Sequence, residues 1–161
     1  MIRSARLSDT QALYVINRDS LGYDSDMSAT KAQLEKLLQD SNHTILVAEE
    51  NGQVIGYVHA QLYETLYFKP LWNLIALAVS QDYQGKGFGV ALLSKLEKLA
   101  QRSNISGIRV NSGISRRGAH AFYKELGYVE RPEQKRFIKT GTNVRLYNIK
   151  SSKLAEKLQK F

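Results

Sequence analysis

The sequence predicts a single domain of mixed α/β class, and three observations support this prediction. Strand-like and helix-like segments follow one another in the order β-α-α-β-β-β-α-β-α-β. No repeat, low-complexity tract or linker rich in Pro, Gly and Ser divides the 161 residues. Hydrophobic residues make up 43% of the chain, which is enough to bury a core.

The N-terminal part of the chain predicts a strand and two helices. Ile2 to Leu7 alternates as a short strand does, and Ser8 begins a capping-box pattern that predicts the start of the first helix. The second helix is expected to start near Ser28 or Thr30 and to stop near Asn42. Its leucines share one face: Leu34, Leu37 and Leu38.

The middle of the chain predicts a hairpin followed by a buried strand. Thr44 to Glu49 and Val54 to Leu62 are β-branched, apolar-rich runs, and the dipeptide Asn51-Gly52 between them tolerates the positive φ angles of a tight turn. Leu71 to Val79 is the kind of apolar run found in buried strands. A glycine-rich turn follows it, and a helix is expected from about Phe88 to Arg102.

The rest of the chain predicts one short strand, one core helix and a C-terminal extension. Gly107 to Asn111 is the strand, and the helix runs from about Arg117 to Leu126. Gly127 suits the left-handed position that follows a helix end. Three further elements are expected: strands at 135–139 and 144–149, and a basic amphipathic helix at 151–161.

Charge and composition limit the classes of function. The chain holds 23 Lys and Arg against 15 Asp and Glu, a net charge of +8, and this favours an anionic partner such as nucleic acid or a phosphate. Residues 130–161 carry +6 of that charge. The lack of cysteine excludes a thiol nucleophile and a thiolate zinc site, and three separated histidines make a poor metal cluster: His43, His59 and His120. No apolar stretch has the length of a membrane span, so we expect a cytoplasmic protein with no membrane partner and no metal.

A glycine-rich loop is the first candidate for a binding site. Gly85, Gly87 and Gly89 lie between the strand at 71–79 and the helix that follows. Glycines leave backbone N–H groups accessible, and a helix N-terminus adds its positive dipole end, so the loop suits a diphosphate or a similar anion. Taken alone, such a loop is equally consistent with a tight turn, and it lacks the Gly-Lys-Ser/Thr ending of a P-loop.

A second motif follows the glycine loop and changes its interpretation. It comprises Ala119, Phe122, Tyr123, Gly127 and Tyr128. Together with Gln84, Gly87 and Gly89, these residues resemble the two signature motifs of the GNAT superfamily of acetyl-CoA-dependent N-acetyltransferases. Those motifs read Arg/Gln-x-x-Gly-x-Gly/Ala and Ala-x-x-Phe-Tyr-x-x-x-Gly-Phe/Tyr.

The resemblance implies an architecture and a division of the chain. The family fold has a central, mostly antiparallel sheet with a splayed parallel pair of strands, flanked by about four helices. Residues 1–140 would form this N-acetyltransferase domain. Residues 141–161 would then be an extension that packs on the same domain or on a partner subunit.

The resemblance also implies how the cosubstrate acetyl-CoA is bound. The backbone of Leu77, Ala78 and Val79 would pair with the pantetheine arm. The loop that would bind the pyrophosphate consists of Gln84, Gly85, Lys86, Gly87, Phe88, Gly89 and Val90. Lys86 can reach the adenosine 3′-phosphate. Arg116 can contact CoA or an anionic acceptor, and an ordinary solvated arginine is the alternative.

Tyr123 matches the family tyrosine that protonates the departing CoA thiolate. A tyrosine with an ordinary pKa of about 10 is a proton donor at neutral pH, so the role is chemically reasonable. A backbone N–H of the strand at 77–79 would meet the developing oxyanion. The alternative for Tyr123 is a core aromatic, because it lies beside Phe122 on an amphipathic helix. Without cysteine there is no Cys-acyl intermediate, and direct attack by an amine is expected.

The acceptor side of the site is less defined. Asn73 stands where many relatives carry a glutamate that acts as general base, so no base is assigned. Glu64, in the loop between the hairpin and the next strand, is a candidate substrate residue along with Asn73, and a solvated loop carboxylate is the ordinary alternative. We interpret His59 as a sheet histidine and His120 as a helix-packing residue rather than as catalytic bases.

The expected function is transfer of an acetyl group from acetyl-CoA to a small amine or a peptide amine, with a homodimer left open. Two alternatives remain: a non-catalytic acyl-CoA sensor with the same fold, and a nucleic-acid-binding module motivated by the charge. The nucleic-acid module is disfavoured, because aromatic and basic residues are not interleaved on any one strand.

Overall fold

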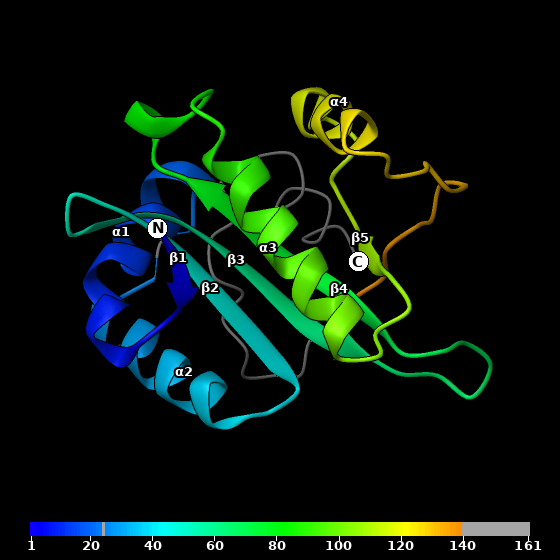
Figure 1. Ribbon diagram of the computed structural model, residues 1–161, viewed down its shortest axis with the longest axis horizontal. Helices are drawn as coiled ribbons and strands as arrows, with labels where there is room; N and C mark the ends of the chain where they lie inside the picture. The colour runs from blue at the N-terminus through cyan, green and yellow to red at the C-terminus, as the bar shows by residue number, and fades with distance from the viewer. Residues whose placement is uncertain (24, 140–161) are drawn as a thin grey trace.

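The computed structural model describes residues 1–23 and 25–139 (Figure 1). Its strands are β1 (Ile2–Ser4), β2 (His43–Glu50), β3 (Gln53–Tyr63), β4 (Leu71–Val79) and β5 (Ile108–Val110). Its α-helices are α1 (Thr10–Leu21), α2 (Met27–Gln39), α3 (Phe88–Arg102) and α4 (Arg117–Glu125), and short 3₁₀ turns span Leu7–Asp9 and Gln81–Tyr83. The strands form one sheet in the order β1-β2-β3-β4-β5, in which β4 and β5 are parallel and the other neighbours antiparallel. The predicted fold class is confirmed.

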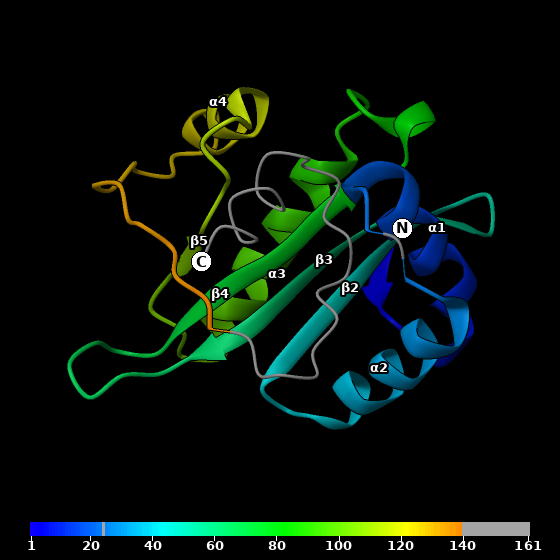
Figure 2. The same cartoon turned by 180° about the vertical axis from the view of Figure 1, so that it is seen from behind.

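The sheet separates two apolar cores, one on each face. Helices cover both faces (Figures 1 and 2). α3 covers one face, where its buried Leu92 and Leu96 pack in the same cluster as Leu74 of β4. α1 and α2 cover the other face, where Leu13 and Leu34 pack in one cluster with strand residues of β2 and β3. Each of these three helices therefore buries an apolar face against the sheet.

The predicted hairpin is present and is closed by the predicted dipeptide. Asn51 has a φ of 51° and Gly52 a φ of 77°, so both central residues of the turn are left-handed. This backbone matches the twist of the two strands it joins, which is why Asn-Gly is favoured there. All of β2 then pairs with β3, from His43 opposite Gln61 to Glu50 opposite Gln53, with one irregularity after Ala48.

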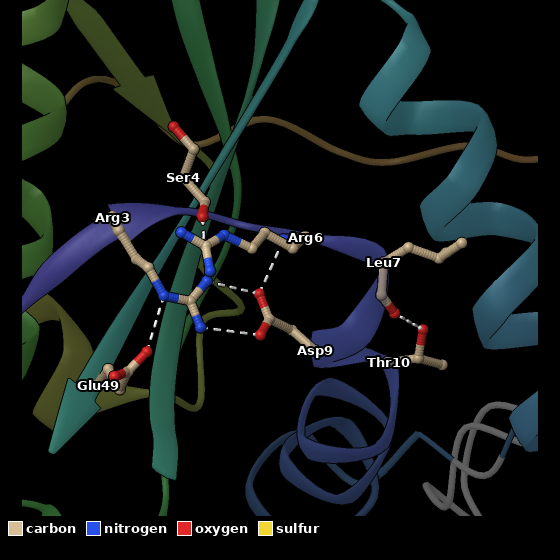
Figure 3. Close-up of polar contacts among 7 residues, drawn as sticks. All are labelled: Arg3, Ser4, Arg6, Leu7, Asp9, Thr10 and Glu49. Atoms are coloured by element: carbon tan, nitrogen blue, oxygen red, sulfur yellow. Dashed lines mark hydrogen bonds and ion pairs between the residues drawn. The ribbon is translucent and has the colours of Figure 1, made fainter. Parts of the chain in front are cut away.

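The N-terminal segment differs from its prediction. The strand ends at Ser4 rather than Leu7, and α1 begins at Thr10 after a 3₁₀ turn, so the predicted Ser8 cap is wrong. The carboxylate of Asp9 accepts the N–H of Arg6 at 2.8 Å instead. Figure 3 shows the guanidinium of Arg3 bound to this carboxylate and, through Nε, to Glu49 of β2. The ion pair of Arg3 with the buried Asp9 therefore stabilises the turn before α1, where the sequence pattern predicted a cap by Ser8.

The second helix begins slightly earlier than predicted, at Met27, because Asp26 caps it. The Asp26 carboxylate accepts the N–H of Ala29 at 2.6 Å, which satisfies one of the free donors of the first turn. Of the predicted apolar face, Leu34 is buried and Leu37 packs against the core, whereas Leu38 is 39% exposed. The helix ends at Gln39, three residues before the expected stop.

β4 carries a bulge that becomes important for the site. Ala76 pairs with His59 and Leu74 pairs with Ala60, so Ile75 is an extra residue with no partner on β3. The bulge reverses the alternation of side chains, since Leu74 packs on the α3 side and Ala78 packs on the other side. Ile75 itself is 47% exposed.

β4 and β5 diverge after a short parallel pairing. Trp72, Asn73 and Leu74 pair with the three residues of β5, and the chain then leaves the sheet toward α4. Within the described residues, the outer edge of β4 from Ile75 to Val79 has no strand partner. Backbone groups along this edge are therefore free to pair with a bound group.

The C-terminal predictions have mixed outcomes. α4 ends next to Gly127, which has the expected positive φ of 84°. Residues 135–139 are not a strand, because this segment pairs with no described strand and leaves Phe137 and Ile138 exposed. The expected strand at 144–149 and helix at 151–161 lie outside the described residues. Within residues 1–23 and 25–139, none of the helices combines the length and the apolar character that crossing a bilayer requires.

Candidate active site

The open edge of β4, the glycine loop and α4 lie toward the same end of the sheet (Figure 1). A cavity of about 350 Å³ lies beside the bulge of β4. It is lined by residues from α1, β3, β4, the end of β5 and α4. The members on which the chemistry depends are Asn17, Tyr57, His59, Ile75, Leu77, Arg116 and Tyr123.

The glycine loop has a backbone that glycine alone adopts easily. Gly85 has a φ of 73° and Gly87 a φ of 85°, and a Cβ at either position would meet nothing within 4 Å. The loop is therefore shaped by left-handed backbone rather than by close packing, and it leaves open space above it. Gln84 holds the loop in place, because its side-chain amide donates a 2.9 Å hydrogen bond to the carbonyl of Val79.

The loop leads directly into the N-terminus of α3. Gly87 is the capping residue and has no side chain, so no side-chain cap covers the first N–H groups of the helix. Those groups and the helix dipole make an anion site of the expected kind. Lys86 lies beside the loop, with its ammonium 5.0 Å from the centre of the Tyr83 ring.

Gly89 supports the contact between the two predicted motifs. A Cβ at Gly89 would lie 3.6 Å from the ring of Phe122, so the first turn of α3 packs closely against α4. The neighbouring Tyr123 is half-buried, with its ring 5.5 Å from that of Tyr128. Tyr123 also lines the cavity. A residue that served only as a core aromatic would not need to face a cavity.

Burial raises the pKa of Tyr123 above its ordinary value, and the positive charge of Arg116 partly opposes this shift. The phenol therefore stays protonated throughout the neutral range. Arg116 precedes the first turn of α4 and lines the same cavity. His120 lies one turn further along, and its Nε2 is 3.0 Å from the carbonyl of Gly113. This contact fits the predicted packing role, since His120 does not line the cavity.

The two candidate substrate residues are not brought into the cavity. Glu64 is exposed in the β3–β4 loop, next to the start of β4 and away from the glycine loop at its other end. Asn73 lies before the bulge, paired with Gln61 and Arg109, and its buried Oδ1 has no hydrogen-bond partner among the described residues. Neither residue lines either of the two described cavities.

A second cavity of about 610 Å³ adjoins the first one. It lies between α1, α2 and the sheet, and it shares Asn17, Tyr57 and His59 with the smaller cavity. Tyr57 donates its hydroxyl to Asn17 at this junction. His59 was interpreted from the sequence as a sheet histidine, so sequence reasoning missed its place between the cavities. The only signal was its position two residues after Tyr57 on one face of β3.

Comparison with protein-family models identifies the family to which this chain belongs. The model described as the acetyltransferase (GNAT) family matches residues 10–128, a range that includes both signature motifs and the open edge of β4. The chain belongs to the GNAT acetyltransferase family. The resemblance drawn from the motifs is confirmed, and the sheet with its parallel β4–β5 pair is the fold of this GNAT acetyltransferase.

Relatives of this GNAT acetyltransferase cover most of its length. It is 32% identical over 135 residues to the uncharacterized N-acetyltransferase YhfO of Bacillus subtilis, covering 80% of this chain and 89% of that one. It is 27% identical over 128 residues to the aminoalkylphosphonate N-acetyltransferase of Salmonella typhimurium, covering 79% and 83%.

Solved structures show that the GNAT fold is shared even at low identity. The aminoglycoside 6′-N-acetyltransferase AAC(6′)-Ih of Acinetobacter baumannii superposes with a TM-score of 0.76 at 18% identity, covering 87% of this chain and 97% of that one. The enzyme AAC(6′)-Iy, bound to a bisubstrate analog built on CoA, gives a TM-score of 0.78 at 15% identity, covering 88% and 98%. At these identities the likeness concerns the fold alone.

Proposed function

We propose that this GNAT acetyltransferase transfers the acetyl group of acetyl-CoA to a primary amine, which attacks directly while both substrates are bound. The observation that carries the proposal is the cavity itself. The open edge of β4 forms one wall of this cavity and Tyr123 of α4 forms another. A thioester bound along the strand edge would therefore lie near the proposed general acid.

The chain's own groups fit a CoA thioester. The outer edge of β4 from Ile75 to Val79, which has no strand partner among the described residues, offers strand-like hydrogen bonds to a pantetheine arm, and Leu77, Ala78 and Val79 would supply them. The residues that would hold the pyrophosphate are the glycine loop and the first turn of α3: Gln84, Gly85, Lys86, Gly87, Phe88, Gly89 and Val90. Arg116 adds a positive charge at the cavity wall. When bound, acetyl-CoA supplies an acetyl group already activated as a thioester.

Tyr123 is the proposed general acid. It lines the cavity, it is half-buried, and its raised pKa keeps the phenol protonated at neutral pH. Proton donation to the departing sulfur lowers the barrier to breaking the carbon–sulfur bond. A backbone N–H on the open edge of β4 stabilises the negative charge that develops on the acetyl oxygen.

The acceptor is proposed to enter through the larger cavity, which joins the smaller one at Asn17, Tyr57 and His59. One relative is named as an aminoalkylphosphonate N-acetyltransferase and one protein of the same fold as an aminoglycoside N-acetyltransferase, so the proposed acceptor class is a small primary amine. The aminoalkylphosphonate relative is the more informative of these, because its match lies in the sequence, over 79% of this chain.

A thiol-release screen tests this proposal. Wild-type protein and acetyl-CoA are incubated with 2-aminoethylphosphonate, an aminoglycoside, a polyamine and a short peptide, and free CoA and the acetylated amine are both measured. The expected result is release of CoA that depends on one amine class, with acetyl-CoA binding detected in parallel by calorimetry. Acetyl-CoA binding without transfer to any of these amines would instead support the sensor alternative.

A further inference from the structure

His59 and His43 form a side-chain pair on the sheet face that borders both cavities. Nδ1 of His43 lies 2.8 Å from Nε2 of His59, and the two rings are 5.1 Å apart. His43 is at the start of β2, where its Nε2 lies 3.8 Å from the carboxylate of Asp40. Polar contacts thus connect His59, at the cavity junction, through His43 to the partly exposed Asp40.

His59 is also next to the bulge where the acetyl group is proposed to lie. It pairs with Ala76, directly after the extra residue Ile75. It lines the smaller cavity together with Tyr123, which comes from α4 on the other side of the β4 edge. A proton donor and a neutral nitrogen base therefore line one cavity from separate elements.

The hydrogen bond between the two rings and the longer ion-pair contact of His43 with Asp40 together indicate which nitrogen of His59 is free. A carboxylate near His43 Nε2 favours a proton on that nitrogen, which leaves His43 Nδ1 as an acceptor. His59 must then donate through Nε2, and its Nδ1 keeps a lone pair. Among the described residues, no hydrogen-bond partner of His59 Nδ1 is found.

Other titratable groups line the same cavities, and none of those described is a neutral base. Tyr57 of β3 donates its hydroxyl to Asn17 and has a pKa raised by burial. The remaining groups are Lys36 of α2, Tyr23 between α1 and α2, and Arg116 and Tyr123 of α4. Burial, with a contribution from His43, lowers the pKa of His59 to about 4, so its imidazole is neutral at physiological pH.

We propose that His59 is the group that takes the proton lost by the acceptor nitrogen, and that His43 and Asp40 pass this proton to solvent. The proposal rests on the acetyl transfer proposed above. The acceptor nitrogen forms its bond to the acetyl carbon while the carbon–sulfur bond breaks, and the sulfur takes the proton of Tyr123. The nitrogen gives one proton to His59 Nδ1, His59 Nε2–H passes its proton to His43 Nδ1, and His43 Nε2–H releases one beside Asp40. Tyr123 regains a proton from solvent, and the two histidines, which the relay leaves protonated on Nδ1, exchange protons with solvent to return to the Nε2-protonated form, so protons balance over the cycle.

A base with a low pKa is sufficient for this step. The nitrogen becomes strongly acidic as its lone pair is drawn into the new amide, so transfer to a neutral imidazole is favourable at that point. The nucleophile is the neutral amine, because an ammonium group has no lone pair, and its first proton has therefore gone to solvent before the step in which His59 takes the second. His43 acts through His59 and is a positioning residue, whereas His59 contacts the reacting nitrogen.

Nuclear magnetic resonance of the histidine rings provides the first test, and it requires no acceptor. The expected result in the wild-type protein at pH 7 is a neutral His59 that carries its proton on Nε2 and accepts none from His43, whose Nε2 carries a proton. A proton on His59 Nδ1, or a charged His59 at pH 7, would overturn the proposal because the free lone pair would then be absent.

Kinetics with the best amine from the thiol-release screen provide the second test. His59→Gln keeps a donor for His43 but cannot take up a proton, so kcat is expected to fall by about 100-fold with acetyl-CoA affinity unchanged. Added imidazole is expected to restore part of the activity of His59→Ala, which a purely structural role would not allow. His43→Asn is expected to give a smaller loss, and His120→Gln, the matched control outside the cavities, none.

The outcomes separate the relay from the function on which it rests. If the wild type transfers acetyl groups and His59→Gln is as active as the wild type, the relay alone is wrong. If the wild type transfers no acetyl group, the proposed function fails and the relay fails with it. Loss of activity in His59→Gln without rescue of His59→Ala by imidazole would also count against a proton-transfer role.

Discussion

The side-chain amide of Gln84 donates a 2.9 Å hydrogen bond to the carbonyl of Val79, which ties the start of the glycine loop to the last residue of β4. This bond joins the two parts of the proposed cosubstrate site, the open strand edge and the loop at the helix N-terminus. Gln84 occupies the first position of the family loop motif, so its role here is to set the loop's position relative to the strand.

Gln84→Ala is expected to weaken acetyl-CoA binding by about fivefold, because one hydrogen bond of about 1 kcal/mol no longer orders the loop. Calorimetric titration with acetyl-CoA measures this. Gln101→Ala, an exposed glutamine at the other end of α3, is the matched control and should leave the affinity unchanged. Equal affinity in both variants would show that the bond does not organise the loop.

Gly87→Ala is expected to lower both stability and acetyl-CoA affinity. The position has a φ of 85°, where an alanine costs about 1 kcal/mol, and the added methyl group would project into the open space above the loop. Gly118→Ala is the control, because Gly118 lies in the first turn of α4 with an ordinary φ and free space around it. Thermal denaturation and calorimetry of both variants provide the comparison, and equal behaviour of the two would contradict this account.

The alkaline limb of the pH profile should report on Tyr123. Because burial raises the pKa of this phenol, kcat is expected to stay level until the pH exceeds about 10, the ordinary tyrosine value. Arg116 lowers that pKa, so Arg116→Ala should move the limb to still higher pH. Arg117→Ala, at an exposed neighbouring position, should not move it. A fall in kcat that begins below pH 9 and is absent in Tyr123→Phe would contradict this prediction.

Arg3→Met should destabilise the fold by about 3 kcal/mol, because Arg3 is the partner of a carboxylate with 5% side-chain exposure. Burial would raise the pKa of Asp9, but Arg3 and the Arg6 N–H more than offset this and hold it below its usual value. A carboxyl group whose pKa is lower in the folded state stabilises the fold at pH values above its unfolded-state pKa of about 4. This stabilisation is lost as the pH falls through the folded-state pKa.

The difference in stability between wild type and Arg3→Met should therefore be largest at neutral pH and narrow toward pH 3. Urea unfolding at several pH values measures this difference. Arg18→Met removes an exposed pair with Asp19 and should change stability little. A difference that is independent of pH would show that Arg3 acts through packing rather than charge.

Local patterns were sufficient to predict most of the fold. Asn51-Gly52 specified the hairpin, and the boundaries of β4 and α3 agree with the predicted Leu71 to Val79 and Phe88 to Arg102. These features depend on period and turn chemistry within a short window. The prediction of a Ser8 cap was wrong because Arg3 binds the carboxylate of Asp9 and holds this turn instead. Arg3 is itself bound to Glu49, which is distant in sequence and is not visible to a local pattern.

The features of the candidate site also differ in whether a local sequence pattern predicts them. The glycine loop and Tyr123 were predicted from motifs. The bulge at Ile75 could not be predicted, because no residue in the apolar run of β4 marks it. The pairing of His43 with His59 depends on strand register between β2 and β3, which no pattern in either strand determines. Glu64 was selected for its loop, and the structure gives that loop no share in either cavity.

The most direct test of the central claim compares the wild type with Tyr123→Phe in acetyl transfer and in acetyl-CoA binding. The account predicts that the variant loses about 100-fold in kcat and binds acetyl-CoA as the wild type does, because only the proton on the phenol is removed. Tyr128→Phe, whose ring touches Tyr123 but does not line the cavity, should retain wild-type turnover. Unchanged turnover in Tyr123→Phe, with an amine that the wild type acetylates, would contradict the claim.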